Sequence, residues 1–216
     1  MSIRLYSYWR SSAAYRVRLA LNLKGLAYET VAVSLLPGKS EHRQAEYRER
    51  NPQMLVQFLG DGDFGVGQSQ AIFEYLEETC PATPLLPGSA QQRAAVRSFC
   101  NSICCDIHPL NNLRVLSYLK ERFGVSDAQR DAWYANWIQE GFRAAEIVAN
   151  AHAHAGPFVF GASVTLADCC LIPQVYNARR FNVPIDDFPR LVAIDAHCNG
   201  LPAFASAIPE NQPDAG

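Results

Sequence analysis

Apolar positions in the first eighty residues alternate between the spacing of strands and the spacing of helices. Ile3–Tyr8 is predicted to be a strand, and Ser11–Lys24 then carries apolar residues at helical spacing until Gly25, a residue type that commonly ends helices. Farther along, the pattern predicts strands at Tyr28–Val33, Val56–Leu59 and Phe64–Val66, a short helix or loop at Glu41–Arg50, and a helix at Ser69–Glu78. The last two strands form a predicted hairpin around Gly60–Gly62. This order predicts a small α/β domain with a mixed sheet.

Beyond residue 88 the strand pattern stops and long helical patterns take over. They cover Ser89–Phe123, Asp127–Ala153 and Leu166–Phe181, and they follow a proline-rich segment, Cys80–Gly88, that we interpret as a linker. Thr165 and Asp168 have the spacing of a capping box, in which each side chain accepts from a backbone N–H at the helix start. The polar tail Pro209–Gly216 is predicted to be frayed. The second region is therefore predicted to be an all-helical bundle.

Composition limits the partners of the protein. The 216 residues are 49% hydrophobic and 19% charged, with a formal net charge of -2, as in ordinary soluble domains. The weak charge argues against a general nucleic-acid or membrane-surface binder. The chain has no apolar run near the roughly 18 residues of a membrane span, and its N-terminus lacks the apolar core of a signal peptide. We therefore expect a cytoplasmic protein with no nucleic-acid or membrane partner.

Seven cysteines are present, and two pairs of them, Cys104–Cys105 and Cys169–Cys170, are adjacent in sequence. Adjacent cysteines are poor disulfide partners and no CxxC motif occurs, so reduced thiols are predicted and a thioredoxin-type redox enzyme is excluded. Cys100, Cys104 and His108 recur at every fourth position and could share a helical face as a metal site. Buried structural thiols are commoner and no second ligand cluster is present, so no metal is predicted.

The serine pair Ser11–Ser12 is the first candidate for chemistry, because it stands where the first strand passes into the first helix. A helix start has unsatisfied N–H groups and a partial positive charge, so a thiol placed there is shifted toward thiolate. A serine hydroxyl can also donate a hydrogen bond to that thiolate. A free thiol has a pKa of about 8.5, so a shift of roughly two units makes thiolate dominant at neutral pH. Taken alone, Ser11 is more simply interpreted as a helix cap with no further role.

Five segments together resemble one family. They are Tyr6–Leu21, Gln68–Ser69, Thr165–Asp168, Pro173–Val175 and Asn177–Phe181, and in this order and spacing they are similar to the zeta class of glutathione transferases. The resemblance runs over nearly the whole chain and implies the cytosolic glutathione transferase fold. That fold has a thioredoxin-like α/β N-terminal domain that binds glutathione, here 1–82, and an all-α helical-bundle C-terminal domain that binds the substrate, here 88–216. The resemblance also implies a homodimer.

The resemblance makes glutathione the expected cofactor and implies the residues that contact it. These are Ser11, Ser12, Ala13, Ala14, Tyr15, Arg16, His42, Val56, Gln68, Ser69, His108, Asn112, Leu113 and Arg114. Two positions depart from the family pattern: Ala13 stands where the family has cysteine, and Gln57 stands where it has a cis-proline. Val56, just before Gln57, is implied to pair through its backbone with the cysteine of glutathione. Either Gln57 keeps the cis bond or the local backbone changes, and this departure bears on glutathione affinity.

For activity, the resemblance implies cis–trans isomerisation of maleylacetoacetate to fumarylacetoacetate, a step of aromatic amino-acid catabolism. The expected substrate is thus a small dicarboxylate enone, whose double bond can rotate once a thiolate has added to it. Ser11 and Ser12 are implied to support the thiolate. Arg10 and Arg180 are implied to bind the substrate carboxylates, a task that suits arginine because its charge is permanent and it can form paired hydrogen bonds.

Other activities stay open on the sequence. Within the class, the stretch Cys105–Asn112 is similar to maleylpyruvate isomerases of gentisate breakdown, and a glutathione transferase or dehalogenase acting on small α-haloacids is a further candidate. A different kind of protein, a non-catalytic binding protein with this fold, is favoured by Ala13 and Gln57. It is opposed by the intact motifs Ser11–Ser12 and Gln68–Ser69.

Overall fold

The computed structural model describes residues 2–215, which form two compact units. The first unit consists of the residues up to Leu85 together with those from Gly200 onward, and the second is Leu86–Asn199. The domain limits expected from the sequence, 1–82 and 88–216, stay a prediction. The segment from Gly200 onward nevertheless lies with the first unit, because hydrogen bonds described below tie it to the first helix.

The first unit is built on a four-stranded sheet with the strand order β2-β1-β3-β4. β1 (Ile3–Ser7) pairs in parallel with β2 (Tyr28–Ala32) and antiparallel with β3 (Phe58–Asp61). β3 in turn pairs antiparallel with β4 (Phe64–Gly67). The sheet is therefore mixed, as the order of elements in the sequence predicts.

The hairpin of β3 and β4 is shifted slightly from its predicted position. Asp61 still pairs with Phe64, so the turn is made by Gly62 and Asp63. Gly62 has φ 61°, a left-handed conformation that glycine adopts without a steric penalty. At its other end β3 begins at Phe58, so Val56, which the pattern places in the strand, lies in the loop before it.

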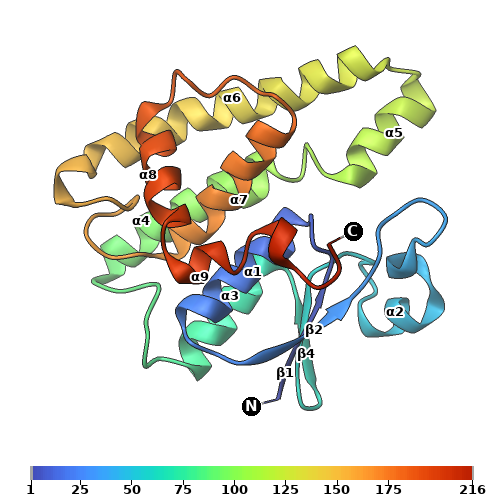
Figure 1. The fold of residues 1–216 in the computed structure, drawn as a ribbon, viewed down its shortest axis with the longest axis horizontal. Coiled ribbons are helices and arrows are strands. Elements are labelled where there is room, and N and C mark those ends of the chain that lie inside the picture. Colours follow the sequence, from blue (N-terminus) through green and yellow to red (C-terminus); the bar gives the residue numbers. More distant parts are fainter. Residues whose placement is uncertain (1, 216) are drawn as a thin grey trace. The chain divides into compact units, whose positions relative to one another are not determined.

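Helices lie on both sides of this sheet. α1 (Ser12–Leu23) and α3 (Ser69–Thr79) lie together on one side, and α2 (Ala45–Arg50), which follows the short η1 (Glu41–Arg43), lies on the other (Figure 1). A small buried core joins the sheet, α2 and the loop before β3, and its members are Tyr6, Tyr8, Val33, Tyr47 and Val56. The loop that contains Val56 is therefore packed in place before the strand begins.

The chain returns to the first unit through α9 (Pro202–Ala205) and η4 (Pro209–Asn211). The Asn22 side chain of α1 donates to a carbonyl oxygen of α9 at 3.1 Å. The Arg18 guanidinium, also from α1, donates from Nε to the carbonyl oxygen of Ala207 at 3.0 Å. These bonds explain why the segment packs on α1 instead of continuing the bundle.

The prediction that the tail frays is wrong for its described residues. Gln212 is 8% exposed, and its side-chain amide donates to two main-chain carbonyl oxygens. Asp214 accepts a hydrogen bond from the backbone of Trp9 at 2.9 Å. Gly216, the last residue of the predicted tail, lies outside the described residues. The polar side chains of the tail form hydrogen bonds with main-chain groups. A polar sequence is equally compatible with such bonds and with contact to solvent, so polarity alone could not predict that the tail is ordered.

The second unit is built from helices around one central element. In chain order these are α4 (Ala90–Asn101), the π-helical turn η2 (Ser102–Ile107), α5 (Leu113–Phe123), α6 (Asp127–Ala151), η3 (Ala153–Ala155), α7 (Leu166–Arg180) and α8 (Pro189–Asn199). Most residues of α7 are buried, and it packs against α4, α8 and η2 (Figure 1). Within residues 2–215, every helix is too short or too polar to span a membrane.

The segment predicted as one helix, Ser89–Phe123, is interrupted in the structure. The residues between η2 and α5 are not helical. Pro109 in this stretch lacks a backbone N–H and cannot join a helical ladder. Asn112 then starts a new helix, because its side-chain oxygen accepts from the Arg114 N–H at 3.1 Å. The helical periodicity continues on both sides of the break, which is why the pattern alone did not reveal it.

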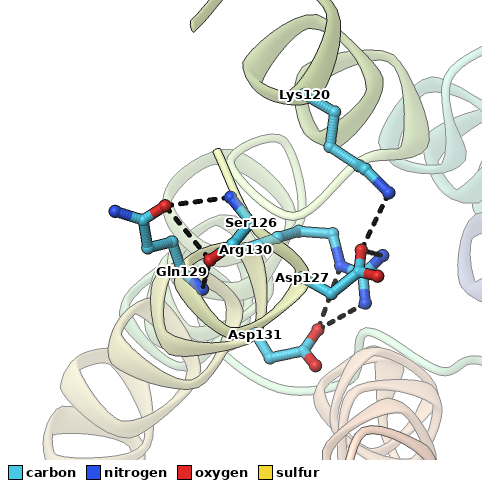
Figure 2. Close-up of polar contacts among 6 residues, drawn as sticks. All are labelled: Lys120, Ser126, Asp127, Gln129, Arg130 and Asp131. Atoms are coloured by element: carbon cyan, nitrogen blue, oxygen red, sulfur yellow. Dashed lines mark hydrogen bonds and ion pairs between the residues drawn. The ribbon is translucent and has the colours of Figure 1, made fainter. Parts of the chain in front are cut away.

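The connection from α5 to α6 is held by exposed polar contacts (Figure 2). Ser126 and Gln129 form a capping box, with the Gln129 N–H 3.2 Å from Ser126 Oγ and the Ser126 N–H 2.9 Å from Gln129 Oε1. Asp127 Oδ1 lies 2.8 Å from the Lys120 ammonium and 2.9 Å from Arg130 Nη1. Exposed ion pairs contribute little individually, so the connection depends on several of them together.

The start of α7 is buried and confirms the predicted capping box. Thr165 Oγ1 accepts from the Ala167 N–H at 3.2 Å. Asp168 accepts from the Thr165 N–H at 2.8 Å and from the Val159 N–H at 2.9 Å, so it also ties the preceding loop to the helix. Burial raises the pKa of the Asp168 carboxyl to about 6, and the hydrogen bonds from Val159 and Thr165 oppose that rise.

Candidate functional site

Ser11, the residue predicted to support a thiolate, is the N-cap of α1. Its Oγ accepts a hydrogen bond from the Ala14 N–H at 3.2 Å. A serine hydroxyl has a proton to donate in addition to its acceptor lone pairs, so this capping bond leaves the proton for a ligand at the helix start. The first turn of α1 contains no acidic side chain that could accept that proton. Ser12 follows as the first helical residue and is 6% exposed.

The loop before Ser11 is held from two directions. The Arg18 guanidinium, which is fully buried, donates to the Trp9 carbonyl oxygen at 3.0 Å and to Ser7 Oγ at 3.3 Å. From the C-terminal segment, Asp214 Oδ2 accepts from the Trp9 N–H at 2.9 Å. Both backbone groups of Trp9 are therefore bonded to side chains, which fixes the residue that precedes Arg10.

Arg10, predicted to bind a substrate carboxylate, is oriented by aromatic neighbours. Its guanidinium lies 4.6 Å from the centre of the Trp9 ring, and its Nη2 donates to the Tyr8 hydroxyl at 3.2 Å. A contact with an aromatic face stabilises a cation without neutralising it. Arg10 thus keeps its charge and its remaining N–H donors while its position is restricted.

The loop that holds Val56 is shaped by Asn51, which is 4% exposed. Asn51 Nδ2 donates to the Leu55 carbonyl oxygen at 2.7 Å, and its Oδ1 accepts from the Gln53 N–H at 3.2 Å. The Tyr47 hydroxyl donates to the same Leu55 oxygen at 2.7 Å. Burial raises the pKa of Tyr47 to about 12, so this hydroxyl stays protonated as a donor. The backbone next to Val56 is thereby fixed from two sides.

Gln68 and Ser69, predicted to bind the glutamyl end of glutathione, form the start of α3. Gln68 has φ 68°, a conformation that costs a non-glycine residue about 1–3 kcal/mol and that recurs at ligand sites. Its side-chain amide donates to Gln53 Oε1 at 2.7 Å. Ser69 is the first helical residue and is 6% exposed. A helix start that also carries a hydroxyl and an amide suits a carboxylate ligand.

Gln57 joins these two helix starts. The Val56–Gln57 peptide bond is cis, so the geometry that the family pattern gives to a proline is present here with glutamine. With the Gln57 amide oriented by its partners, its nitrogen donates to the Ala13 carbonyl oxygen at 3.1 Å and its oxygen accepts from the Ser69 N–H at 2.7 Å. The Gln57 side chain therefore links Ala13, in the first turn of α1, to Ser69, the first residue of α3.

Two other residues of the first unit, His42 and Arg16, are also predicted to contact glutathione. His42 is on η1, and its Nδ1 is buried without a hydrogen-bond partner among the described residues. Burial lowers the pKa of His42, so the imidazole is neutral at neutral pH. Arg16 is 1% exposed, and its Nε and Nη2 have no partner within residues 2–215. Its side chain is buried, so the predicted contact of Arg16 would run through its backbone.

Four residues that are predicted to contact glutathione lie near the start of α5 in the second unit. His108 is partly buried in the stretch that follows η2. The Asn112 side chain is used as the N-cap of α5, which is a structural role. Leu113 and Arg114 are exposed in the first turn of that helix. The structure places these four residues close in the chain and leaves their contact with glutathione a prediction.

Arg180, the second predicted carboxylate-binding residue, is exposed at the end of α7. Its guanidinium lies 4.8 Å from the centre of the Phe181 ring, and that ring stacks on Tyr134 with ring centres 3.8 Å apart. The neighbouring Arg179 forms an ion pair with Asp195. The two adjacent arginines thus have different surroundings, and only Arg180 rests on an aromatic column.

The cysteines contribute no recognisable metal site to this part of the molecule. All seven are in the thiol form, and Cys104 and Cys170 have their sulfur atoms 3.7 Å apart. Burial raises the pKa of the Cys169 thiol and of the Cys198 thiol. In the described part of the chain, no three His, Cys, Asp or Glu side chains are grouped so that they could hold a metal ion.

Comparison with known proteins decides the family. A family model described as "Glutathione S-transferase, N-terminal domain" matches residues 5–84, and one described as "Glutathione S-transferase, C-terminal domain" matches residues 131–197. A "Probable maleylacetoacetate isomerase" of Vibrio cholerae serotype O1 is 48% identical over 215 residues, which are 100% of this chain and 99% of that protein. The chain belongs to the glutathione S-transferase family.

Solved structures of family members agree with the architecture described above. A holo maleylpyruvate isomerase, described as a bacterial zeta-class glutathione S-transferase, has a TM-score of 0.95 and 46% identity, covering 99% of this chain and 100% of that one. A maleylacetoacetate isomerase of Methylobacterium extorquens AM1, with bound malonate and GSH, has a TM-score of 0.93 and 37% identity, covering 99% of each chain. The predicted fold, a thioredoxin-like α/β domain with an all-α region, is confirmed.

Within this glutathione S-transferase, three residues that the sequence pattern does not mark as site residues shape the predicted site. The sequence flags Gln57 only as a departure from the family pattern, yet its side chain bonds to both helix starts. Arg18 belongs to the serine-containing motif, and its position in an apolar helix could have indicated a buried anchor. Asp214 sits in a polar tail with no local signal for its bond to Trp9.

Proposed function

We propose that this glutathione S-transferase is a glutathione-dependent cis–trans isomerase that converts maleylacetoacetate to fumarylacetoacetate. The observation that carries the proposal is the 48% identity, over almost the full length of both chains, to the Vibrio cholerae protein named as a probable maleylacetoacetate isomerase. The surroundings of Ser11 give the proposal a chemical basis, because its capped hydroxyl retains a proton for a ligand.

The first unit would hold glutathione. We assign its sulfur to Ser11 and Ser12, its cysteine backbone to the Val56 main chain, and its glutamyl end to Gln68 and Ser69. The donor set supports this assignment, since hydroxyls, a side-chain amide and helix-start N–H groups suit a ligand with a thiolate and a carboxylate. The order of these groups along the chain also matches the family pattern.

When bound, glutathione supplies a thiolate that can add to a double-bond carbon of the substrate and leave again after the bond has rotated. The task of the chain is to keep that sulfur deprotonated. The N-terminus of α1 favours negative charge, and the Ser11 hydroxyl, whose oxygen is held by the Ala14 N–H, has its proton to donate. A lowering of the thiol pKa by roughly two units from about 8.5 would make thiolate dominant at neutral pH.

Arg10 and Arg180 would bind the two carboxylates of the substrate. Each guanidinium has an aromatic ring beside it, Trp9 at 4.6 Å and Phe181 at 4.8 Å from the ring centres. A ring against one face leaves the edge N–H groups of an arginine for a paired bond to a carboxylate. A dicarboxylate, malonate, is bound together with GSH in the Methylobacterium extorquens relative, which supports a dicarboxylate substrate here.

A second candidate is the isomerisation of maleylpyruvate. The observation that favours it is the TM-score of 0.95 and the 46% identity to the holo maleylpyruvate isomerase. Both substrates present a cis double bond next to a carbonyl and a carboxylate at each end, so the same residues would serve either. Transfer of glutathione to small α-haloacids would need the same thiolate and is a lesser proposal of the same kind.

We also propose that the protein works as a homodimer in the cytoplasm. Family membership supports the dimer, and the weak net charge of -2 fits a cytoplasmic enzyme of small anions. Light scattering after size exclusion tests the dimer: a particle of twice 23.9 kDa is expected, and a mass of 23.9 kDa would contradict it.

The test of the activity follows the ultraviolet absorbance of maleylacetoacetate and of maleylpyruvate with purified protein, with and without glutathione. We expect conversion of both compounds that requires glutathione, with the larger kcat/KM on maleylacetoacetate. A larger kcat/KM on maleylpyruvate would favour the second candidate. No conversion of either compound by folded protein that binds glutathione would refute isomerase activity, and no binding of glutathione would favour the non-catalytic alternative.

A further inference from the structure

Gln57 is a buried polar residue whose bonds run between the two parts of the proposed glutathione site. It is 4% exposed and lies directly after Val56, in the loop before β3. A buried amide needs partners for both its nitrogen and its oxygen. With the amide assigned so that its nitrogen faces an acceptor and its oxygen faces a donor, these partners are the Ala13 carbonyl oxygen at 3.1 Å and the Ser69 N–H at 2.7 Å. The side chain therefore bridges two helix starts that are far apart in sequence.

Each end of this bridge is next to a residue assigned to glutathione. Ala13 is in the first turn of α1, immediately after Ser12 and two residues after the cap Ser11. Ser69 is the first residue of α3 and follows Gln68, whose φ of 68° must be maintained by its surroundings. A displacement of either helix start would alter the spacing between the groups assigned to the sulfur and those assigned to the glutamyl end.

The family pattern has proline at this position, and a proline side chain can neither donate nor accept a hydrogen bond. The bridge is therefore a feature of this chain. The Gln57 oxygen also accepts from the Ser69 N–H. Of the two donors of Ser69, the hydroxyl is therefore the one that does not bond to Gln57. Binding sites gain affinity when their groups are held in place before the ligand arrives, because less ordering remains to be done on binding.

We propose that Gln57 is a positioning residue for glutathione, which sets the spacing of the α1 and α3 starts through its two backbone bonds. This inference rests on the proposed function, since it takes the roles of Ser11, Gln68 and Ser69 from there. Gln57 is assigned no contact with the sulfur or with the dicarboxylate. Its effect should fall on glutathione affinity and leave the chemical step nearly unchanged.

The test compares Gln57→Met, which keeps the side-chain volume and removes both bonds, with Gln57→Glu, which keeps an acceptor for the Ser69 N–H. The probe is S-methylglutathione, measured by titration calorimetry, because its blocked sulfur has no proton to lose and reports binding alone. We expect the Kd to rise about tenfold for Gln57→Met and about threefold for Gln57→Glu. Gln91→Ala, on the exposed surface of α4, is the control and should leave the Kd unchanged.

Kinetics give the second readout. In both variants the KM for glutathione should rise with the Kd, whereas kcat at saturating glutathione should stay within about twofold of the unmutated protein. A fall in kcat with an unchanged KM for glutathione would overturn the inference, because it would place Gln57 in the chemical step. If Gln57→Met does not fold, Gln57→Glu decides the same question.

The outcomes separate the two levels of the proposal. If the unmutated protein neither binds S-methylglutathione nor isomerises maleylacetoacetate, the proposed function fails and this inference fails with it. If the unmutated protein does both, and the folded Gln57 variants bind S-methylglutathione within twofold of it, only the role of Gln57 is overturned. Weaker binding with kcat retained supports the inference.

Discussion

The helix starts of α1 and α7 both carry a hydroxyl residue as N-cap, and they differ in what surrounds that hydroxyl. At α7, Thr165 has a reciprocal partner in Asp168, and both residues are buried, with 3% and 0% of their surface exposed. At α1, Ser11 is partly exposed and the first turn has no acidic residue. An N-cap hydroxyl therefore has a structural role where an acidic side chain of the same helix start pairs with it. Where no such side chain is present, the hydroxyl is available to a ligand.

The difference also concerns which backbone groups are bonded. Asp168 bonds to the Val159 N–H outside its helix, so the α7 start holds a loop in place. Ser11 Oγ accepts from the Ala14 N–H of its own helix start, and the loop before it is fixed by Arg18 and Asp214 instead. At α1 the loop is therefore fixed by side chains other than Ser11, which is consistent with the role proposed for the Ser11 hydroxyl.

Removing the acid of the α7 box should give the largest effect and should be purely one of stability. Asp168→Ala leaves the buried Val159 and Thr165 N–H groups without their acceptor, so the free energy of unfolding should fall by about 3 kcal/mol. Urea unfolding measures this, with the exposed Asp187→Ala as a control that should change little. A loss below about 1 kcal/mol, or a change in kcat per folded molecule, would contradict a purely structural role for the α7 helix start.

Removing the cap of α1 should do the opposite and affect activity more than stability. Ser11→Ala should lower kcat about a hundredfold and move the pH profile of kcat to higher pH, because the bound thiol loses a donor to its thiolate. The loss of the cap should cost only about 1 kcal/mol of stability. Ser11→Thr retains a capping hydroxyl and should keep most of the activity. Equal loss of kcat in both variants would show that the hydroxyl is not the active group.

Releasing the loop before Ser11 should give a smaller effect, mainly on substrate binding. Asp214→Ala removes the acceptor of the Trp9 N–H and should loosen Arg10, which rests on the Trp9 ring. We expect the KM for the dicarboxylate to rise about fivefold with kcat nearly unchanged. Asp214→Asn keeps an oxygen acceptor and should lie close to the unmutated protein. If the alanine and asparagine variants have the same KM, the bond to Trp9 has no part in positioning Arg10.

The exposed capping box of α6 should give the smallest effect and completes the series. Ser126→Ala removes the acceptor of the Gln129 N–H in a solvated position, where water can replace it. The free energy of unfolding should fall by about 0.5 kcal/mol, and kinetic constants should not change. Denaturant unfolding beside Asp168→Ala measures the contrast. A cost as large as that of Asp168→Ala would mean that burial does not distinguish the boxes.

Local signals predicted the parts of the fold that depend on nearby residues. β1, α1, α3 and α6 follow the periodicity of their own segments, and the capping box at Thr165 follows from a spacing of three. The break before α5 did not appear in the periodicity, because Pro109 and Asn112 act on a stretch whose apolar spacing looks helical on both sides. The periodicity of apolar residues indicates which face of a helix is buried. It does not indicate where the backbone hydrogen bonds of the helix end.

The site shows the same division between near and distant partners. The family resemblance names Ser11, Gln68 and Ser69 as predicted site residues, and each of them lies at a helix start. The partners of Gln57 and Asp214 lie in other elements, and Trp9 and Asp214 are 205 positions apart. No spacing rule reaches that far, so their roles became visible only when the folded chain placed them together.

The return of the segment from Gly200 to the first unit sets an order on biosynthesis. The ribosome delivers β1, α1 and the serine pair first, then the whole second unit, and only afterwards the residues that bond to Arg18 and Trp9. Until that moment the buried Arg18 guanidinium lacks one of its acceptors, and the nascent N-terminal unit is incomplete. Newly made chains should thus complete the surroundings of Trp9 late, and a bulky tag fused directly behind Asp214 would lie next to the loop that contains Trp9.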